Sequence, residues 1–476
     1  MPSAISSLAR EHLDRVRAFY DAAPTVPLPG ARAYRALLAH YYNLLIPAGA
    51  SVLEIGCGSG ELLSRIRAAR KVGIDLSATQ IAAARVRLPE AEFFAQAGEL
   101  CETSERAETF DVIIISDTLN LAADVQRLFE RLHVVSNADT RLLVNFQNTL
   151  WRPFLSLARG LGLKAKQPQN SWLASSDVLN LLRLAGWSPV ARHGRILVPF
   201  HALGLGSFVN RWLGPLLQWF CLTVFLVARR DAGGTQRPLT VSVVIPARNE
   251  AGNILAAVAR TPEMGAGTEL IFVEGHSRDH TWAEMQRVVA ANPQRRIKIL
   301  RQTGQGKGDA VRAGFAVATG EVLMILDADL TMPPEELPKF YEVIASGRAD
   351  FANGVRLVYP MDEKAMQFLN LCANKAFGLI FTWLLGQPVK DTLCGTKVLT
   401  RSHYERIAAH RSYFGDFDPF GDFDLLFGAA KQNLKIADVP IRYRERTYGT
   451  TNIQRWRHGW LLLRMVLFAA RKLKFI

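Results

Sequence analysis

Apolar residues in the first half of the chain fall into short runs separated by amphipathic stretches. Residues 51–56, 110–116 and 141–146 are apolar at nearly every position, as in strands that are covered on both faces. Between such runs, residues 60–69 and 77–88 have the composition and spacing of helices. The alternation predicts a mostly parallel sheet with helices on both sides.

A second series of the same kind begins near residue 240. Four apolar runs predict strands, and three amphipathic stretches between them predict helices. The polar segment with Gly and Pro that separates the two series is typical of a linker. We therefore predict an α/β protein of two tandem domains, each a mostly parallel, doubly wound sheet. The expected parts are a first domain at 1–230, a linker at 231–240, a second domain at 241–454 and a basic amphipathic helix at 455–476.

Length and composition agree with this organisation. A chain of 476 residues with 49% apolar and 21% charged residues is typical of a globular protein with two or three domains. The five cysteines form no CxxC pair, and the N-terminal residues lack the apolar core of a signal peptide. Both features favour a cytoplasmic setting. The net charge of +14 predicts an anionic partner but does not identify it.

Three glycines, Gly56, Gly58 and Gly60, stand between a predicted strand and a predicted helix, where backbone can approach a ligand closely. Asp75 ends the next strand, where a carboxylate can accept both hydroxyls of a ribose. With Glu54, this pattern resembles the class I S-adenosylmethionine-dependent methyltransferases over roughly residues 35–230.

The resemblance implies S-adenosylmethionine as cofactor. Glu54 and the three glycines are then expected around its methionine part, with Asp75 at its ribose. The adenine contact stays open between Gln96 and Glu99. No motif indicates the methyl acceptor, and Asp117, Asn145, His193 and His201 are interpreted as structural residues.

Residues 212–228 form an apolar stretch that is at the short limit for a membrane span. Pro215 and Gln218 interrupt it, so we interpret it as a helix followed by the last strand of the first domain.

In the second half, Asp327 and Asp329 follow an apolar strand directly, at the sheet edge where ligands bind in open α/β folds. Two carboxylates so close repel each other unless a cation compensates their charge. Hard oxygen ligands suit Mg²⁺ or Mn²⁺, which commonly bridges carboxylates to substrate phosphates.

Several motifs occur around this pair in one order: "VSVVIPARNE", "FVEGHS", "GQGKGDA", "DAD" and "KDTLCGTK". They resemble the family 2 glycosyltransferases of GT-A fold over residues 240–455, especially relatives of dolichol-phosphate mannose synthase. The resemblance implies a nucleotide-sugar donor, with Asp327, Asp329 and Thr331 as metal ligands. The donor-binding residues it implies are Pro246, Ala247, Arg248, Glu250, Glu274, Lys307, Asp309 and Arg446.

The acceptor remains open between a lipid phosphate and a glycan. A hydroxyl acceptor needs a general base, for which Asp422 or Asp424 is the candidate. A phosphate is already ionised and needs positioning, for which Arg356, Arg444 and Arg446 are candidates. Asn452 stands where the family pattern has a lysine, which weakens the analogy at this contact.

Residues 442–476 contain nine Lys or Arg and one acid, interleaved with Trp and Leu. This pattern favours a helix lying on an anionic membrane surface. Residues 368–385 resemble the interface helix of the family. We therefore expect a peripheral protein on the cytoplasmic face of the membrane, and assign the basic charge to lipid in preference to nucleic acid.

The leading hypothesis is a bifunctional enzyme, in which a methyltransferase is fused to a metal-dependent, inverting glycosyltransferase. The alternative is a glycosyltransferase with a non-catalytic S-adenosylmethionine-binding or anchoring module at its N-terminus. The oligomeric state is open.

Overall fold

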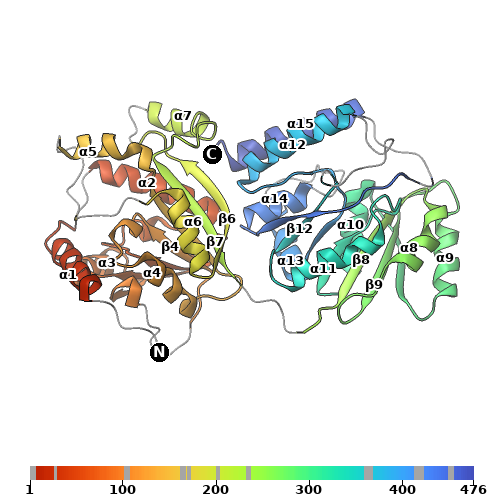
Figure 1. The fold of residues 1–476 in the computed structure, drawn as a ribbon, viewed down its shortest axis with the longest axis horizontal. Coiled ribbons are helices and arrows are strands. Elements are labelled where there is room, and N and C mark those ends of the chain that lie inside the picture. The colour runs from red at the N-terminus through yellow and green to blue at the C-terminus, as the bar shows by residue number, and fades with distance from the viewer. Residues whose placement is uncertain are drawn as a thin grey trace. The chain divides into compact units, whose positions relative to one another are not determined.

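A computed structural model describes residues 7–25, 29–100, 108–160, 168, 173–199, 204–231, 237–356, 358, 368–411, 423–446, 448 and 455–476. Contacts between residues divide the chain after Asp231 into two compact units, Met1–Asp231 and a second unit that starts at Ala232 (Figure 1).

The first unit contains a seven-stranded sheet in the order β3-β2-β1-β4-β5-β7-β6. Only β7 runs antiparallel to its neighbours. The strands are β1 (Ser51–Ile55), β2 (Arg70–Asp75), β3 (Glu92–Ala95), β4 (Val112–Ser116), β5 (Arg141–Gln147), β6 (Trp187–Arg195) and β7 (Thr223–Arg230). The α-helices are α1 (Ser7–Asp21), α2 (Pro29–Leu45), α3 (Ala78–Arg87), α4 (Val125–Arg131), α5 (Arg152–Gly160), α6 (Ser175–Leu184) and α7 (Leu205–Trp212).

Helices cover both faces of this first sheet, because alternate residues of each central strand point to opposite sides. Val52, Val112 and Ile114 pack in one core with α2 and α3. Leu53 and Ile113 face the other way, into a core with α4 and α6.

The second unit has its own seven-stranded sheet, in the order β10-β9-β8-β11-β13-β12-β14, and only β13 is antiparallel. Its strands are β8 (Val241–Ala247), β9 (Thr268–Glu274), β10 (Arg296–Arg301), β11 (Val322–Ile325), β12 (Phe351–Val355), β13 (Lys397–Thr400) and β14 (Ile436–Pro440). The α-helices are α8 (Ile254–Arg260), α9 (Thr281–Ala291), α10 (Gly306–Val317), α11 (Leu337–Ala345), α12 (Phe368–Leu385), α13 (Arg401–Ala409), α14 (Phe423–Lys431) and α15 (Arg455–Leu473).

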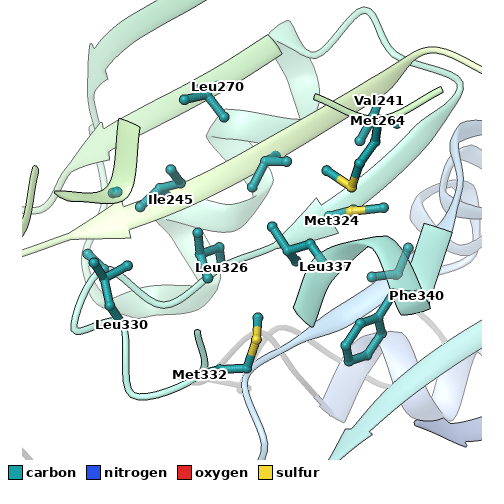
Figure 2. Close-up of a cluster of buried hydrophobic side chains, with 14 of the residues drawn as sticks. Val241, Ile245, Met264, Leu270, Met324, Leu326, Leu330, Met332, Leu337 and Phe340 are labelled. Carbon is teal, nitrogen blue, oxygen red and sulfur yellow. The ribbon is translucent and has the colours of Figure 1, made fainter. Parts of the chain in front are cut away.

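A hydrophobic core of this unit lies between the sheet and helices α8, α9 and α11 (Figure 2). Val241 and Ile245 of β8 meet Met324 of β11 and Leu337 and Phe340 of α11 there. On the opposite face α10 packs on β8 and β9. The expected fold class, two tandem α/β domains with mostly parallel sheets, is confirmed, and the C-terminal helix is present as α15.

The helix predicted over residues 60–69 is wrong. Only a 3₁₀ turn, Leu63–Arg65, forms there. Ser51 of β1 and Arg70 of β2 are register partners, so the connection must return along the whole length of β1. Five strand residues span about 17 Å, whereas the ten residues of the predicted helix would rise only about 15 Å. A tight turn followed by extended backbone covers that distance.

The apolar stretch at 212–228 contains the predicted strand, but the helix predicted before it is wrong, because residues 213–222 form turns. The helix α7 ends at Trp212, and the strand β7 begins at Thr223. Across the part of the chain that the structure describes, no helix combines the length and the apolarity that crossing a membrane requires.

Candidate functional site

The glycine loop of the first unit follows β1 in a backbone conformation that requires glycine. Gly56, Gly58 and Gly60 have φ values of 74°, 52° and 71°, in the left-handed region. A Cβ atom on Gly56 would also lie 2.3 Å from the side-chain oxygen of Thr118, which follows β4. The loop is therefore pressed against the end of β4, and a larger residue at position 56 has no room.

Asp75 lies directly beside this loop. Its carboxylate accepts hydrogen bonds from the backbone N–H of Gly58 at 2.7 Å and of Ser77 at 2.9 Å. Burial raises the pKa of Asp75, against the effect of these two donors. The structure thus brings together the glycines and the acid that the sequence singled out, at the carboxyl edge of the sheet.

Glu54 is buried below the loop, with 2% of its surface exposed. Its Oε2 atom is inaccessible to water and has no hydrogen-bond partner in the described structure. Desolvation raises the pKa of Glu54 to about 8, and the nearby charge of Asp75 adds to this effect. A buried carboxyl group with an unsatisfied oxygen is suited to a ligand that carries positive charge.

We predict that Glu54 makes the first unit less stable as the pH rises. Its pKa of about 8 exceeds the ordinary 4.5, so the folded state holds a proton that the unfolded state has lost between these values. Stability therefore falls with pH through this window, by about 1.4 kcal/mol per unit. Glu54→Gln should remove the fall and gain roughly 3 kcal/mol over wild type between pH 5 and pH 7.5. Calorimetric unfolding of both proteins at several pH values measures this; parallel curves would contradict it.

Polar residues at the ends of β4 and β5 form a network next to the glycine loop. Asp117 has φ 51°, an uncommon value for a non-glycine residue. Its carboxylate accepts a hydrogen bond from the amide of Asn145 at 2.9 Å, and Asn145 accepts one from Tyr42 at 2.6 Å. Asp117 and Asn145 are thus brought together, whereas His193 lies within β6 and His201 lies outside the described residues.

In the second unit, every second residue of the segment after β11 is buried in the core, and the predicted metal ligands are the residues between them. Leu326, Ala328, Leu330 and Met332 are all buried in the core shown in Figure 2. Asp327, Asp329 and Thr331 are the residues between them. The apolar side chains therefore anchor the loop at every second residue. Leu330 adopts φ 50°, a strained conformation of the kind that concentrates at functional sites.

Asp327 forms an ion pair with Lys307 of α10, with Nζ 2.7 Å from the carboxylate. Burial alone would raise the pKa of Asp327, but Lys307, with Lys397 and Arg356, holds it below its ordinary value. Gly395 lies against this ion pair, since a Cβ atom at position 395 would lie 2.1 Å from the Asp327 carboxylate and 2.3 Å from the Lys307 ammonium.

Asp329 is bound from both sides. Thr331 donates its backbone N–H and its hydroxyl to one carboxylate oxygen, at 3.1 and 2.9 Å. Arg446 donates to the other oxygen at 2.7 Å, and also to Glu250 at 2.9 Å. Burial raises the pKa of Glu250, although Arg446 opposes this effect. Glu250, from the end of β8, and Asp329, from the end of β11, are thus joined by one guanidinium.

The other predicted donor residues lie along the same sheet edge. Pro246 and Ala247 end β8 and precede Arg248, whose Cβ lies near Gly275 after β9. Glu274 ends β9 and accepts a hydrogen bond from the N–H of Ser277 at 2.5 Å. Asp309 lies in the first turn of α10, where its carboxylate accepts a hydrogen bond from the N–H of Gly304 at 2.9 Å.

The predicted acceptor residues are engaged with other groups. Arg356 makes a bidentate pair with Asp391, at 2.8 and 2.9 Å. Although burial lowers the pKa of Arg356, Asp391 keeps it above its usual value. Asp424 accepts a hydrogen bond from Arg411 at 3.1 Å. Asp422, the other base candidate, and Asn452 lie outside the described residues.

Two residues at this site were not selected from the sequence. Asp391 holds Arg356, and Gly395 allows Asp327 and Lys307 to meet. Both belong to the motif "KDTLCGTK", which was recognised only as a whole. The acid and the glycine within this motif were the features of the sequence that could have identified both residues.

Comparison with known families assigns both units. Residues 242–407 match the model of glycosyl transferase family 2, and residues 53–142 match that of a methyltransferase domain. A dolichyl-phosphate hexose transferase of Haloferax volcanii is 32% identical over 222 residues, which are 46% of this chain and 89% of that protein.

Two further relatives match the same half. A dolichol-phosphate mannosyltransferase of Pyrococcus furiosus is 29% identical over 224 residues, 45% of this chain and 60% of that protein. An undecaprenyl-phosphate 4-deoxy-4-formamido-L-arabinose transferase of Pectobacterium carotovorum is 29% identical over 216 residues, 44% of this chain and 62% of that protein. The chain thus spans less than two thirds of these two relatives.

Among solved structures, a magnesium protoporphyrin IX methyltransferase of Synechocystis with bound SAH is similar with a TM-score of 0.32 and 16% identity. The match covers 46% of this chain and 99% of that one. The family matches and the Haloferax relative suffice: this chain belongs to glycosyl transferase family 2 through its second unit, and its first unit carries a methyltransferase domain.

Proposed function

We propose that the chain is a bifunctional enzyme. Its second unit transfers a sugar from a nucleotide-sugar to a polyprenyl phosphate, and its first unit transfers a methyl group from S-adenosylmethionine. The proposal of sugar transfer rests mainly on the pair Asp327 and Asp329. The two aspartates follow β11 in a loop that is anchored in the core, and they form ion pairs with Lys307 and Arg446. The substrate class is taken from the relatives described above, whose names state that they use dolichol phosphate or undecaprenyl phosphate.

The donor set fits a magnesium or manganese ion that shares its ligands with a substrate. No cluster of three or more His, Cys, Asp or Glu suited to a metal occurs among the described residues. Two carboxylates, with Thr331 beside them, match an ion that completes its shell with phosphate oxygens and water. When bound, the ion would offset the negative charge that develops on the leaving diphosphate.

The chain itself supplies further positive charge at this place. Lys307 and Arg446 each lie 2.7 Å from one of the two aspartates. A diphosphate drawn to the aspartates by a divalent ion therefore meets an ammonium and a guanidinium. Arg446 can bind phosphate oxygens with two parallel N–H groups, which also orients the group that it holds.

A phosphate acceptor agrees better with the structure than a hydroxyl acceptor does. Asp424 is buried and bound to Arg411, so it is not presented as a base in this conformation. A phosphate monoester is already ionised and attacks the sugar carbon without proton removal. For the lipid phosphate, Arg356 is held in a fixed orientation by Asp391 and by the ring of Tyr443, 5.2 Å from its guanidinium carbon.

The residues of the first unit fit S-adenosylmethionine. The glycine loop leaves open space at Gly58, where an added Cβ atom would meet nothing within 4 Å, and Asp75 is a partly buried acid next to it. The unsatisfied oxygen of Glu54 would be compensated by the positive charge of the methionine part. Asp117, at the end of β4, lies one residue from Thr118, which touches the loop, and is our candidate for orienting a methyl acceptor.

Two helices of the second unit support attachment to the membrane. Helix α12 packs against α15, and Figure 1 shows the two together. Leu462, Met465 and Ala469 of α15 are buried, whereas Trp460 and Leu467 are exposed among basic residues. Such a face suits a helix that lies in the headgroup region of anionic lipid, on the cytoplasmic side where nucleotide-sugars are made available.

A donor screen tests the glycosyltransferase proposal. Purified protein would be given UDP-, GDP- and dTDP-sugars with polyprenyl phosphate, and the lipid product measured by chromatography. We expect one nucleotide class to give product, and chelation of divalent ions to stop the reaction until Mg²⁺ or Mn²⁺ is restored. Product formation that persists in chelator would contradict the metal-dependent mechanism.

A further inference from the structure

Helix α7 of the first unit is oriented opposite to what its composition predicts. Its buried residues are Gly206 and Asn210, whereas Leu205 and Phe208 are exposed. Asn210 fixes this orientation, because its side chain binds the N–H and the C=O of Val198 at 2.8 and 2.7 Å. A helix on a water-facing surface normally buries its apolar side. The exposed face of α7 therefore calls for a partner other than water.

The exposed apolar side chains continue beyond α7. Phe154 and Leu157, one helical turn apart, are exposed on α5, and Trp219 and Phe220 are exposed in the segment between α7 and β7. We call these four residues, with Leu205 and Phe208, the α5–α7 surface. Phe154 has 64% and Trp219 has 71% of its surface exposed. Apolar patches of this kind on a folded surface mark sites of interaction.

Hydrogen bonds hold the backbone beneath this surface. The side-chain amide of Asn148 donates to the carbonyl oxygens of Trp219 and Cys221, at 2.9 and 3.1 Å. The indole N–H of Trp151 donates to the carbonyl of Phe220 at 2.7 Å. These bonds tie the start of α5 to the segment before β7. The backbone that carries the exposed rings of Trp219 and Phe220 is thus held in place by these hydrogen bonds.

The charge around the surface selects the kind of partner. The segment that carries the surface, residues 141–230, contains eleven Lys or Arg, of which Arg141, Arg195 and Arg229 are buried, and a single acid, Asp177. Arg152 and Arg211 are exposed on α5 and α7, and the guanidinium of Arg192 lies 5.0 Å from the ring of Trp219. Exposed Trp, Phe and Leu among arginines, with hardly an acid nearby, match the boundary between lipid headgroups and acyl chains. The positive charge complements anionic lipid.

The surface also lies at the functional edge of the sheet. Gln147, at the end of β5, and Arg195, at the end of β6, both pair with Thr223, the first residue of β7. Helices α5 and α7 and the segment before β7 all connect at this point. The carboxyl ends of the parallel strands, where the glycine loop and Asp75 lie, form the same edge.

We propose that the methyltransferase unit has its own membrane-binding site, the α5–α7 surface, and that its partner is an anionic lipid bilayer. This contact is separate from the one proposed for α12 and α15 in the second unit. It also places the methyl acceptor at the membrane, as a molecule carried by lipid; that consequence rests on the proposed methyl transfer, whereas the lipid contact does not.

The contact can be tested on the full chain with fluorescent labels. Trp219→Cys and Phe154→Cys would each carry an environment-sensitive dye, and Val86→Cys would serve as control, because Val86 on α3 is 85% exposed outside the surface. Wild-type protein taken through the same labelling corrects for native cysteines. With vesicles of phosphatidylglycerol and phosphatidylethanolamine, the two surface labels should shift to the blue and be quenched by spin-labelled lipid. The Val86 label should stay in water.

A vesicle-bound protein whose Trp219 and Phe154 labels remain in water would overturn the inference while leaving α15 as the membrane contact. A blue shift without vesicles, together with a dimer in analytical ultracentrifugation, would also overturn it and assign the surface to a second copy of the chain. Phe154→Asp with Leu157→Asp should lower partitioning onto these vesicles at least about tenfold, whereas Val86→Asp should not change it.

Discussion

Asp327→Asn is expected to lower sugar transfer about 10³-fold while the protein stays folded and binds S-adenosylmethionine as wild type does. The carboxylate lies 2.7 Å from Lys307 and stands with Asp329 in the loop that follows β11. Loss of metal assistance at a leaving group is worth several kcal/mol, and about 1.4 kcal/mol corresponds to tenfold in rate. Initial rates with the donor found in the screen measure the loss.

Glu335→Gln is the matched control for this variant. Glu335 is also an acid, but it pairs with Arg260 outside the site, at 2.8 Å. Its replacement should leave the rate of sugar transfer within about twofold, since surface ion pairs contribute little. A rate for Asp327→Asn close to that of the control would show that the sugar is transferred elsewhere or by another mechanism.

Asp75→Ala is expected to weaken S-adenosylmethionine binding about 10²-fold without changing sugar transfer. Two hydrogen bonds from ribose hydroxyls to one carboxylate are together worth about 3 kcal/mol, which corresponds to that factor. The substitution also releases the N–H groups of Gly58 and Ser77, which Asp75 now binds. Asp75→Asn keeps the shape of the side chain and should show an intermediate loss. Titration calorimetry measures both affinities.

The two variants control each other, because Asp327 and Asp75 belong to different compact units. If Asp75→Ala lowered sugar transfer as strongly as it lowered binding, the two activities would be coupled. Wild-type protein that gave no heat with S-adenosylmethionine would instead favour the alternative of a non-catalytic first unit.

Much of the architecture follows from local patterns in the sequence. The strand β11 and the loop after it illustrate why, since Leu326, Ala328 and Leu330 alternate with acids and polar residues. Such a period indicates which side chains enter the core before any partner is known. The glycine loop is equally local, because φ values above zero at Gly56, Gly58 and Gly60 favour glycine itself.

Features that depend on distant residues could not be predicted in this way. Arg446 reaches Asp329 across 117 positions of sequence, and that pairing exists only once the sheet has formed. The failed helix at 60–69 depended on the length of β1, which the local pattern does not contain. The orientation of α7 was set by Asn210 binding to Val198, against the apolar composition of the helix.

The measurement that tests the central claim most directly is anomalous diffraction from crystals soaked with Mn²⁺ and the nucleoside diphosphate of the preferred donor. We expect one manganese peak in contact with the carboxylates of Asp327 and Asp329, bridged to the diphosphate, with Lys307 and Arg446 turned toward the phosphate oxygens. Bound nucleotide with no manganese at these two aspartates, and with both side chains still paired to Lys307 and Arg446, would contradict the account.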